Sequence, residues 1–289
     1  MNFKKYNFIF VFMVALVVAM PIVSVSTRSR TPSADINDEL PPVIEVDTND
    51  QKPSKQNAYK FGNAWQAYNH VLSSTFATSY KMKTVQNLVA SANVGVKLDF
   101  NQKVMLDTYV TKDGKTLEET YSSGTKEFFN VAYFDGKDVY SQKVDGSFVV
   151  GQKPNVTPNK ATKADYIKSE GVMPAFTFNL NKNNSSASFF TKTGSKYVFK
   201  LTVTDSSVWQ DYLKKINIMS GSERYPNMNA LSIDFEVSAK TGNLLKMTIT
   251  EEYGIKYMGI DVTCRSTSVK QFYEVGQNVE LPSLSYMGL

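Results

Sequence analysis

Hydrophobic and polar residues alternate with a period of two over several stretches of the chain. The clearest stretch is 231–237, where four large apolar residues, Leu231, Ile233, Phe235 and Val237, are separated by single polar residues. The alternation recurs at residues 94–100, 197–203, 245–249 and 260–264. Because successive side chains of a strand point to opposite faces of a sheet, the pattern predicts strands with one buried and one solvated face. Such strands are typical of antiparallel sheet.

Short turn signals separate these stretches. Asp-Gly or Thr-Gly pairs stand at 113–114, 135–136, 145–146, 193–194 and 241–242. Glycine adopts the positive φ that tight hairpin turns require, and Asp before it tolerates the same backbone region. Hairpins join strands that are neighbours in the sequence. The chain is therefore predicted to form a meander of about eight to eleven strands in one large sheet.

Three segments change to a helical period. Phe61, Ala64, Trp65, Tyr68 and Leu72 form one apolar stripe, which predicts an N-terminal helix before the first strand. His70 lies on this helix away from the strongest part of the stripe, and we interpret it as a surface or packing residue. The two further helices interrupt the sheet, so the fold class is predicted to be α+β.

The later helices are marked by capping signals. Thr162 with Asp165 three residues on predicts a helix start, and Gly171 predicts its end. Ser207 with Gln210 predicts the start of the next helix, which would end at Gly221. Between them, residues 171–180 mix proline with bulky apolar residues, and this composition predicts a mobile flap over an apolar surface.

The N-terminus predicts export. Lys4 and Lys5 precede an uninterrupted apolar run at 8–20, the layout of a secretory signal, so residues 1–26 are predicted to be a signal peptide or an uncleaved membrane anchor. Residues 27–57 are rich in Pro, Ser, Asp and Asn and are predicted to form a disordered polar tether. Residues 58–289 are predicted to be a single domain, on the extracellular face of the membrane or secreted.

The residues that carry most chemistry are scarce. The chain has one His and one Cys, and its formal net charge is +5. Cys264, on the apolar side of a predicted strand, is interpreted as a core residue. The carboxylate pairs 118–119 and 251–252 are interpreted as surface charge, since strand neighbours point to opposite faces. These observations predict a non-enzymatic protein with no metal site, no cofactor and no nucleic-acid partner.

Flexible apolar side chains are abundant instead. Methionine fills irregular space and suits surfaces that accept varied partners, although most buried methionines are ordinary core. The flap and the helix after Ser207 are the places where a cavity is most plausible. The predicted lining of a hydrophobic ligand cavity is Met173, Phe176, Phe178, Trp209, Tyr212 and Met219.

Three segments carry a resemblance to a known family: "AWQAYNHVLSSTFATSYKMKT" (64–84), "NVAYFDGKDVYSQKVDG" (130–146) and "LSIDFEVSAKTGNLLKMTIT" (231–250). With the order of elements over about residues 58–282, they resemble the LolA/LolB and LppX/LprG-like superfamily of lipoprotein and lipid carriers, and related uncharacterised exported proteins of Gram-positive bacteria. The resemblance implies a half-barrel, a large curved antiparallel sheet whose concave face is covered by the helices and can enclose acyl chains. The chain lacks the lipidated cysteine common among the Gram-positive members, and no binding residue is carried over.

Three functions are compatible with these predictions. The first is an exported bacterial envelope protein, expected to be a monomer, that binds a lipid or another hydrophobic or amphipathic ligand at the membrane surface. The alternative is an extracytoplasmic scaffold or interaction module with a filled core, contacting envelope proteins or wall polymer. A hydrolase with an unrecognised site is a third alternative. A ligand pocket requires roughly 300 Å³, whereas the scaffold predicts only small voids.

Overall fold

The computed structural model describes residues 58–93, 97–125, 127–220, 222–257 and 259–289. The predicted signal or anchor (1–26) and tether (27–57) lie outside the described residues. Within these ranges, no helix is long and apolar enough to cross a membrane. Eleven strands form one sheet. They are β1 (Tyr80–Asn93), β2 (Lys97–Val110), β3 (Thr116–Gly124), β4 (Phe128–Phe134), β5 (Asp138–Asp145), β6 (Asn159–Thr162), β7 (Ser185–Thr193), β8 (Lys196–Val203), β9 (Asn227–Ser238), β10 (Leu244–Tyr257) and β11 (Ile260–Tyr273).

The strand order confirms the predicted meander. The order is β6-β5-β4-β3-β2-β1-β11-β10-β9-β8-β7, and all neighbours are antiparallel. The first and last strands pair at the middle of the sheet, from Lys81 opposite Tyr273 to Ala92 opposite Val262. This central pair joins two runs of sequential strands into one sheet. Every other pairing is between neighbours in the sequence, as hairpin turns require.

Four of the five predicted turns are hairpins. The pairs at 113–114, 135–136, 193–194 and 241–242 connect β2–β3, β4–β5, β7–β8 and β9–β10. Their glycines all have positive φ. The pair Asp145-Gly146 ends β5 but leads into a long loop, because β6 begins only at Asn159. The turn chemistry is local and could be predicted, whereas the place of the next strand depends on distant residues.

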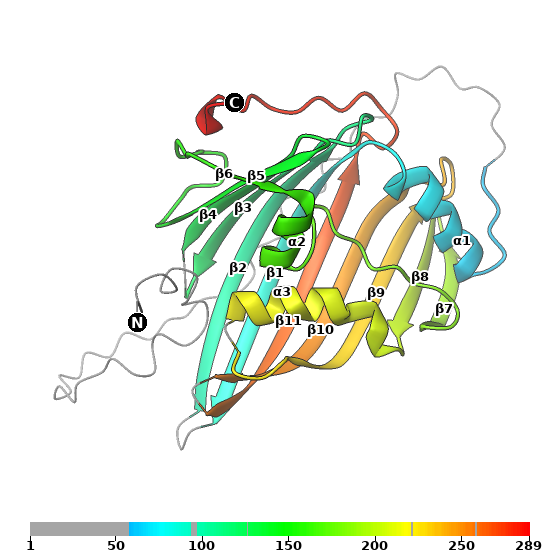
Figure 1. Ribbon diagram of the computed structural model, residues 1–289. Helices are drawn as coiled ribbons and strands as arrows, with labels where there is room; N and C mark the ends of the chain where they lie inside the picture. The colour runs from blue at the N-terminus through cyan, green and yellow to red at the C-terminus, as the bar shows by residue number, and fades with distance from the viewer. Residues whose placement is uncertain (1–57, 94–96, 126, 221, 258) are drawn as a thin grey trace, which may run out of the picture.

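The sheet is open and strongly curved, and the helices lie on its concave face (Figure 1). They are α1 (Ala64–Val71), α2 (Lys163–Glu170) and α3 (Gln210–Ser220). A π-helical turn, Leu72–Phe76, extends α1 toward β1. The architecture is thus an α+β half-barrel, as predicted.

The helix caps match the prediction in one case and differ in another. The Thr162 side chain accepts a hydrogen bond from the backbone N–H of Asp165 at the start of α2, and Gly171 ends that helix with φ of 86°. Ser207 is not a cap, which corrects the prediction for α3. Asp205 accepts from the N–H of Ser207 instead and begins a 3₁₀ turn, Ser206–Trp209, that runs into α3. An ionised carboxylate is a stronger acceptor for this exposed N–H than a hydroxyl.

The apolar core lies between the concave face and α1. Leu231, Ile233, Phe235 and Val237 are all buried, as their alternation predicted. Phe235 stacks on Phe199 of β8 with ring centroids 4.9 Å apart and meets Tyr68 of α1 edge to face. Cys264 is fully buried on the same face. Burial of these large side chains provides the main driving force for this half of the fold.

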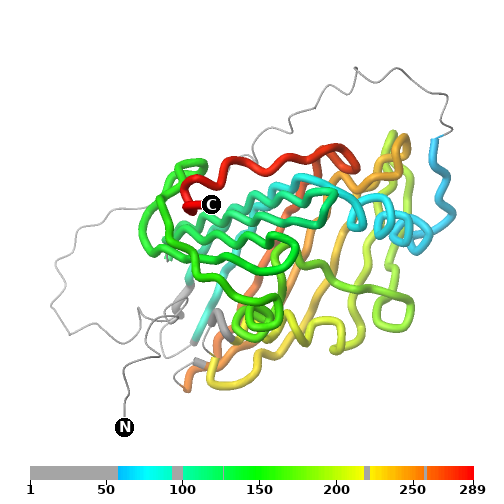
Figure 2. The backbone as a smooth tube through the Cα atoms, turned by 45° about the horizontal axis from the view of Figure 1, so that its top comes forward, coloured from blue at the N-terminus to red at the C-terminus, as the bar shows by residue number. Residues whose placement is uncertain are grey.

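A second, smaller core lies on the outer, convex face. The C-terminal segment, residues 274–289, runs beside β3–β5 (Figure 2). It packs Tyr286 and Met287 against Leu117 and Phe129. Glu119 is 1 % exposed there. It accepts a hydrogen bond from the Tyr286 hydroxyl and lies 2.6 Å from Lys153 Nζ. The interpretation of Glu119 as surface charge is therefore wrong. The carboxylate tolerates burial because it has a cation and a hydroxyl as partners.

His70 is a packing residue. Its ring lies against Tyr59 and Phe61, with centroids 4.5 and 5.4 Å away. A Cβ added at Gly242 would lie 2.2 Å from His70 Nε2. The turn between β9 and β10 therefore needs glycine both for its φ of 73° and for the space that His70 occupies.

Candidate ligand site on the concave face

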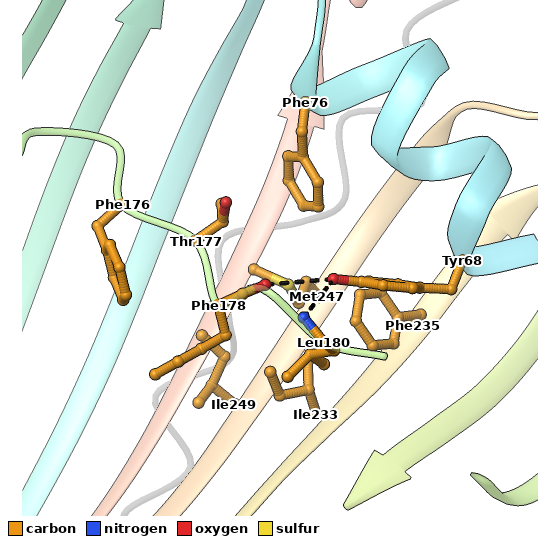
Figure 3. A pocket seen from close by; sticks show the side chains of 10 residues that line it. All are labelled: Tyr68, Phe76, Phe176, Thr177, Phe178, Leu180, Ile233, Phe235, Met247 and Ile249. Atoms are coloured by element: carbon orange, nitrogen blue, oxygen red, sulfur yellow. Dashed lines mark hydrogen bonds between the residues drawn. The ribbon is translucent and has the colours of Figure 1, made fainter. Parts of the chain in front are cut away.

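A flap crosses the concave face between α2 and β7. We define the flap as residues 172–184, the green segment that passes in front of the sheet in Figure 1. Tyr68 of α1 holds its second half (Figure 3). The Tyr68 hydroxyl donates to the Phe178 carbonyl at 3.2 Å and accepts from the N–H of Leu180 at 3.2 Å. Burial raises the pKa of Tyr68. One side chain therefore satisfies two backbone groups of the flap.

The first half of the flap is held by the sheet. Glu118 of β3 accepts a hydrogen bond from the N–H of Ala175, 3.1 Å from its Oε2. Ala175 has φ of 59°, in the left-handed region that costs a residue with a Cβ about 1–2 kcal/mol. The Glu118 bond helps to offset this strain. The flap is thus an irregular segment fixed by a few side-chain contacts.

Helices α2 and α3 meet closely beside the flap. A Cβ at Gly171 would lie 2.7 Å from the backbone nitrogen of Lys215 and 3.1 Å from the carbonyl oxygen of Asp211. With its φ of 86°, Gly171 is the residue that lets the two helices approach. The flap and α3 therefore form one continuous cover over the concave face.

The space under the flap is small. The cavity drawn in Figure 3 has a volume of about 10 Å³, room for about one water molecule. Its lining is apolar on the sheet side and aromatic on the flap side: Tyr68, Phe76, Phe176, Thr177, Phe178, Leu180, Ile233, Phe235, Met247 and Ile249. The roughly 300 Å³ expected of an open ligand pocket is not present here. The apolar floor is instead covered by the chain's own side chains.

Three of the predicted lining residues come together. Phe178 lies edge to face with Phe176 and Tyr212, with ring centroids 5.3 and 5.2 Å away, and Phe176 and Tyr212 are parallel at 6.3 Å. Phe176 and Phe178 line the cavity. Their grouping places the flap and α3 in direct contact.

The other three predicted residues do not join this cluster. Trp209 packs at the edge of the main core. Met173 packs instead against a separate small cluster with Ala132, Val139 and Tyr166, because it follows shortly after α2, which carries Tyr166. The side chain of Met219 lies outside the described residues.

Tyr212 also connects α3 to the sheet. Its hydroxyl donates to Glu251 Oε2 of β10 at 3.0 Å. Glu251 is 3 % exposed, so its interpretation as surface charge is wrong. Burial raises the pKa of Glu251 to about 7, while hydrogen bonds from Tyr212 and Ser266 and the charge of Lys270 act in the opposite direction. Burial and the Glu251 charge raise the pKa of Tyr212 well above its usual value.

The concave face changes from apolar to polar at its centre. Lys270 of β11 lies directly opposite Thr84 of β1 and Met247 of β10. Lys270 is partly buried, and among the described residues no carboxylate forms an ion pair with it. Its pKa is lowered by burial, against the charges of Glu118 and Glu251, and is lowered further by Lys215 of α3.

Two hydroxyl groups accompany this lysine. Thr84 and Thr108, 4 % and 1 % exposed, have hydroxyl oxygens with no hydrogen-bond partner among the described residues. Sequence reasoning missed this polar patch because the alternation was followed only to Cys264. When the alternation of β11 is continued beyond Cys264 in steps of two residues, it places Ser266, Ser268 and Lys270 on the inner face.

The carboxylate pairs are split between the two faces, as their spacing predicted. Glu118 and Glu251 face inward, whereas Glu119 faces the outer core and Glu252 pairs with Arg265 at 2.9 Å. Within the described ranges, no group of three His, Cys, Asp or Glu side chains is arranged to hold a metal ion. Burial raises the pKa of the Cys264 thiol to about 12, which disfavours the nucleophilic thiolate.

Of the three kinds of comparison made with known proteins, the one with solved structures gives matches. No protein-family model and no curated sequence matches the chain. A LolA superfamily protein from Nitrosomonas europaea is 10 % identical, with TM-score 0.24, over 76 % of this chain and 94 % of that chain. A β-barrel-like protein of domain of unknown function DUF1849 from Brucella abortus is 8 % identical, with TM-score 0.27, over 68 % and 99 %.

A DUF1329 family protein from Desulfovibrio piger is 10 % identical, with TM-score 0.26, over 76 % of this chain and 95 % of that chain. TM-scores this low say nothing about function. A LolA superfamily protein is among the structures to which this chain is similar.

Proposed function

We propose that this protein binds the acyl chain of an amphipathic ligand on the concave face of its sheet, beneath a displaced flap, and catalyses no reaction. The observation that carries the proposal is an apolar floor covered by a segment fixed mainly through Tyr68 and Glu118. We further propose that the protein is exported through its N-terminal segment and acts at the outer surface of the membrane. The basic, apolar start of the sequence supports this location.

Displacement of the flap is energetically reasonable. Phe176 and Phe178 cover the floor formed by Ile233, Met247 and Ile249. Removing the two rings from this surface costs about 2–3 kcal/mol each, and each ligand methylene that replaces them contributes about 0.8 kcal/mol. A chain of about five to eight methylenes therefore offsets the loss of both rings. The strain at Ala175 lowers the cost of opening further.

The cavity volume of about 10 Å³ favours a second candidate function. If the flap does not open, the protein is an interaction module with a filled core, and its contacts with envelope proteins or wall polymer use the outer face. The two candidates differ in a single property, which is whether the floor becomes accessible to a hydrophobic chain.

A fluorescent fatty acid such as cis-parinaric acid tests the proposal by titration into the full chain. The variant Phe176→Ala removes one ring from the cover, while Phe189→Ala removes a ring that is 42 % exposed on the edge strand β7. We expect saturable one-to-one binding by wild type, tighter binding by F176A, and no change in F189A. Absence of saturable binding in both wild type and F176A favours the filled-core module and rejects the carrier.

A further inference from the structure

The inner face of the sheet carries a group of polar atoms that the fold leaves without partners. Lys270 projects from the central strand β11 with no ion pair among the described residues, and the hydroxyls of Thr84 and Thr108 are buried without hydrogen bonds. Buried polar groups in folded proteins are nearly always paired, because an unpaired one loses its hydration without compensation. Two such hydroxyls on neighbouring strands, beside a partly buried lysine without an ion pair, indicate a site whose partner is a ligand.

These groups lie close together on one face. Thr84 and Lys270 are directly opposite each other on β1 and β11, which brings their Cβ atoms to about 5 Å. Thr108 of β2 is opposite Met82, one step diagonal from Thr84, a separation of about 7–8 Å. Lys270 also neighbours Met247, which lines the apolar cavity. The polar group therefore borders the apolar floor.

We propose that Lys270, Thr84 and Thr108 bind the anionic head, a carboxylate or a phosphate, of the amphiphile whose chain occupies the apolar floor. The inference rests on the proposed function and adds the chemistry of the head group. An ammonium supplies up to three donors and each hydroxyl supplies one, so the group as a whole requires an acceptor-rich partner. A negatively charged oxygen group meets this requirement.

Two carboxylates near the lysine do not fill this role. Glu118 and Glu251 influence Lys270 electrostatically, but neither forms an ion pair with it. Each accepts a hydrogen bond from a segment that covers the concave face. Glu118 accepts from the N–H of Ala175 in the flap, and Glu251 accepts from the Tyr212 hydroxyl of α3. Lys215 on α3 adds a second positive charge near Lys270. Since the pKa of Glu251 is about 7, this carboxylate is partly neutral near neutral pH and repels an anion less.

The test compares ligands of one chain length and different heads. Dodecanoate, dodecyl phosphate and dodecan-1-ol are titrated calorimetrically into the full chain near neutral pH, alongside acetate and inorganic phosphate. We expect the two anionic dodecyl compounds to bind at least about tenfold more tightly than the alcohol, because charge-assisted hydrogen bonds are stronger than neutral ones. Acetate and inorganic phosphate, which lack the chain, are expected to bind far more weakly.

Lys270→Gln provides the matched variant, and Lys83→Gln, on the outer face of β1, provides its control. K270Q is expected to bind all three dodecyl compounds with the affinity of the alcohol, while K83Q keeps the wild-type preference. Lys270 is only partly buried and has no ion pair to lose, so replacing its ammonium by a neutral amide should preserve the fold. The wild-type comparison of acid with alcohol needs no variant, so the test holds even if K270Q does not fold.

The failures of the two proposals are distinguishable. Equal affinities for acid and alcohol in wild type, or a preference that survives in K270Q, overturn the head-group assignment and leave chain binding intact. Failure of all three dodecyl compounds to bind overturns the proposed function and the head-group site together. Binding of acetate or inorganic phosphate as tight as that of the dodecyl anions overturns the amphiphile as the source of the anion.

Discussion

The Tyr212 hydroxyl donates a 3.0 Å hydrogen bond to Glu251 Oε2, and this bond joins helix α3 to the middle of strand β10. Glu251 is buried and Tyr212 is half-buried beneath the flap and α3. The bond connects a covering helix to a carboxyl group that titrates in the neutral range. The stability of the cover should therefore depend on pH.

Glu251→Gln tests this dependence. Burial raises the pKa of Glu251 from about 4.5 to about 7, so the folded state binds its proton more tightly than the unfolded state. Its stability is therefore highest below pH 4.5 and falls as pH rises through about 7, by about 3 kcal/mol if the full shift is expressed. Urea unfolding of both proteins across this range should show E251Q increasingly more stable than wild type. If the difference in the free energy of unfolding between E251Q and wild type does not change with pH, the raised pKa of Glu251 is contradicted.

Tyr68→Phe tests the anchor of the flap. The change removes a hydroxyl that serves the Phe178 carbonyl and the Leu180 N–H, and leaves both backbone groups without that partner. We expect a loss of about 1–3 kcal/mol in the free energy of unfolding and faster hydrogen exchange within residues 172–184. Tyr225→Phe removes an exposed hydroxyl bound to the Gln210 carbonyl and should change neither quantity. Unchanged exchange in Y68F contradicts the anchoring role.

Ala175→Gly tests the strain in the flap. Glycine adopts φ near 59° without the contact of a Cβ, so the closed flap gains stability. We expect an increase of about 0.5–1 kcal/mol in the free energy of unfolding. A slower uptake of acyl probe should accompany it, because a more stable closed flap opens less often. Destabilisation by A175G argues that the backbone strain is absent.

Gly242→Ala tests the packing of His70. The added methyl would lie 2.2 Å from Nε2 and would be held at φ of 73°, so we expect a loss of about 2–4 kcal/mol. In a His70→Ala background the steric part disappears and the same change should cost only about 1 kcal/mol. The four free energies of unfolding form a double-mutant cycle. If the losses in the free energy of unfolding from G242A and H70A simply add in the double variant, Gly242 and His70 are not in contact.

Local patterns predict much of this fold. The alternation at 231–237 identifies β9 and its buried face, and Thr162 identifies the start of α2, because both depend on neighbouring residues only. The burial of Glu119 depends on a C-terminal segment more than 150 residues away, as the 167-residue separation from Tyr286 shows. No local pattern carries such information.

Only part of the candidate site could be predicted, because some of its contacts also join residues that are distant in the sequence. Phe176, Phe178 and Tyr212, which were chosen for their apolar segments, meet in the structure, whereas Met173 packs elsewhere; their binding of a ligand stays a prediction. Lys270 could have been found by extending the alternation of β11. The sequence could not show that Lys270 has no ion pair, because this depends on where the carboxylates of Glu118 and Glu251 lie in the fold.

The most direct measurement follows methyl NMR signals of the full chain during titration with a spin-labelled fatty acid. Ile233, Met247 and Ile249 line the floor under the flap, whereas Val85 and Val269 lie opposite each other on the outer face and serve as the internal control. Binding of the acyl chain beneath the flap predicts saturable broadening of the three inner signals with the two outer signals unchanged. Inner signals that stay sharp at every ligand concentration, or equal broadening on both faces, would contradict it.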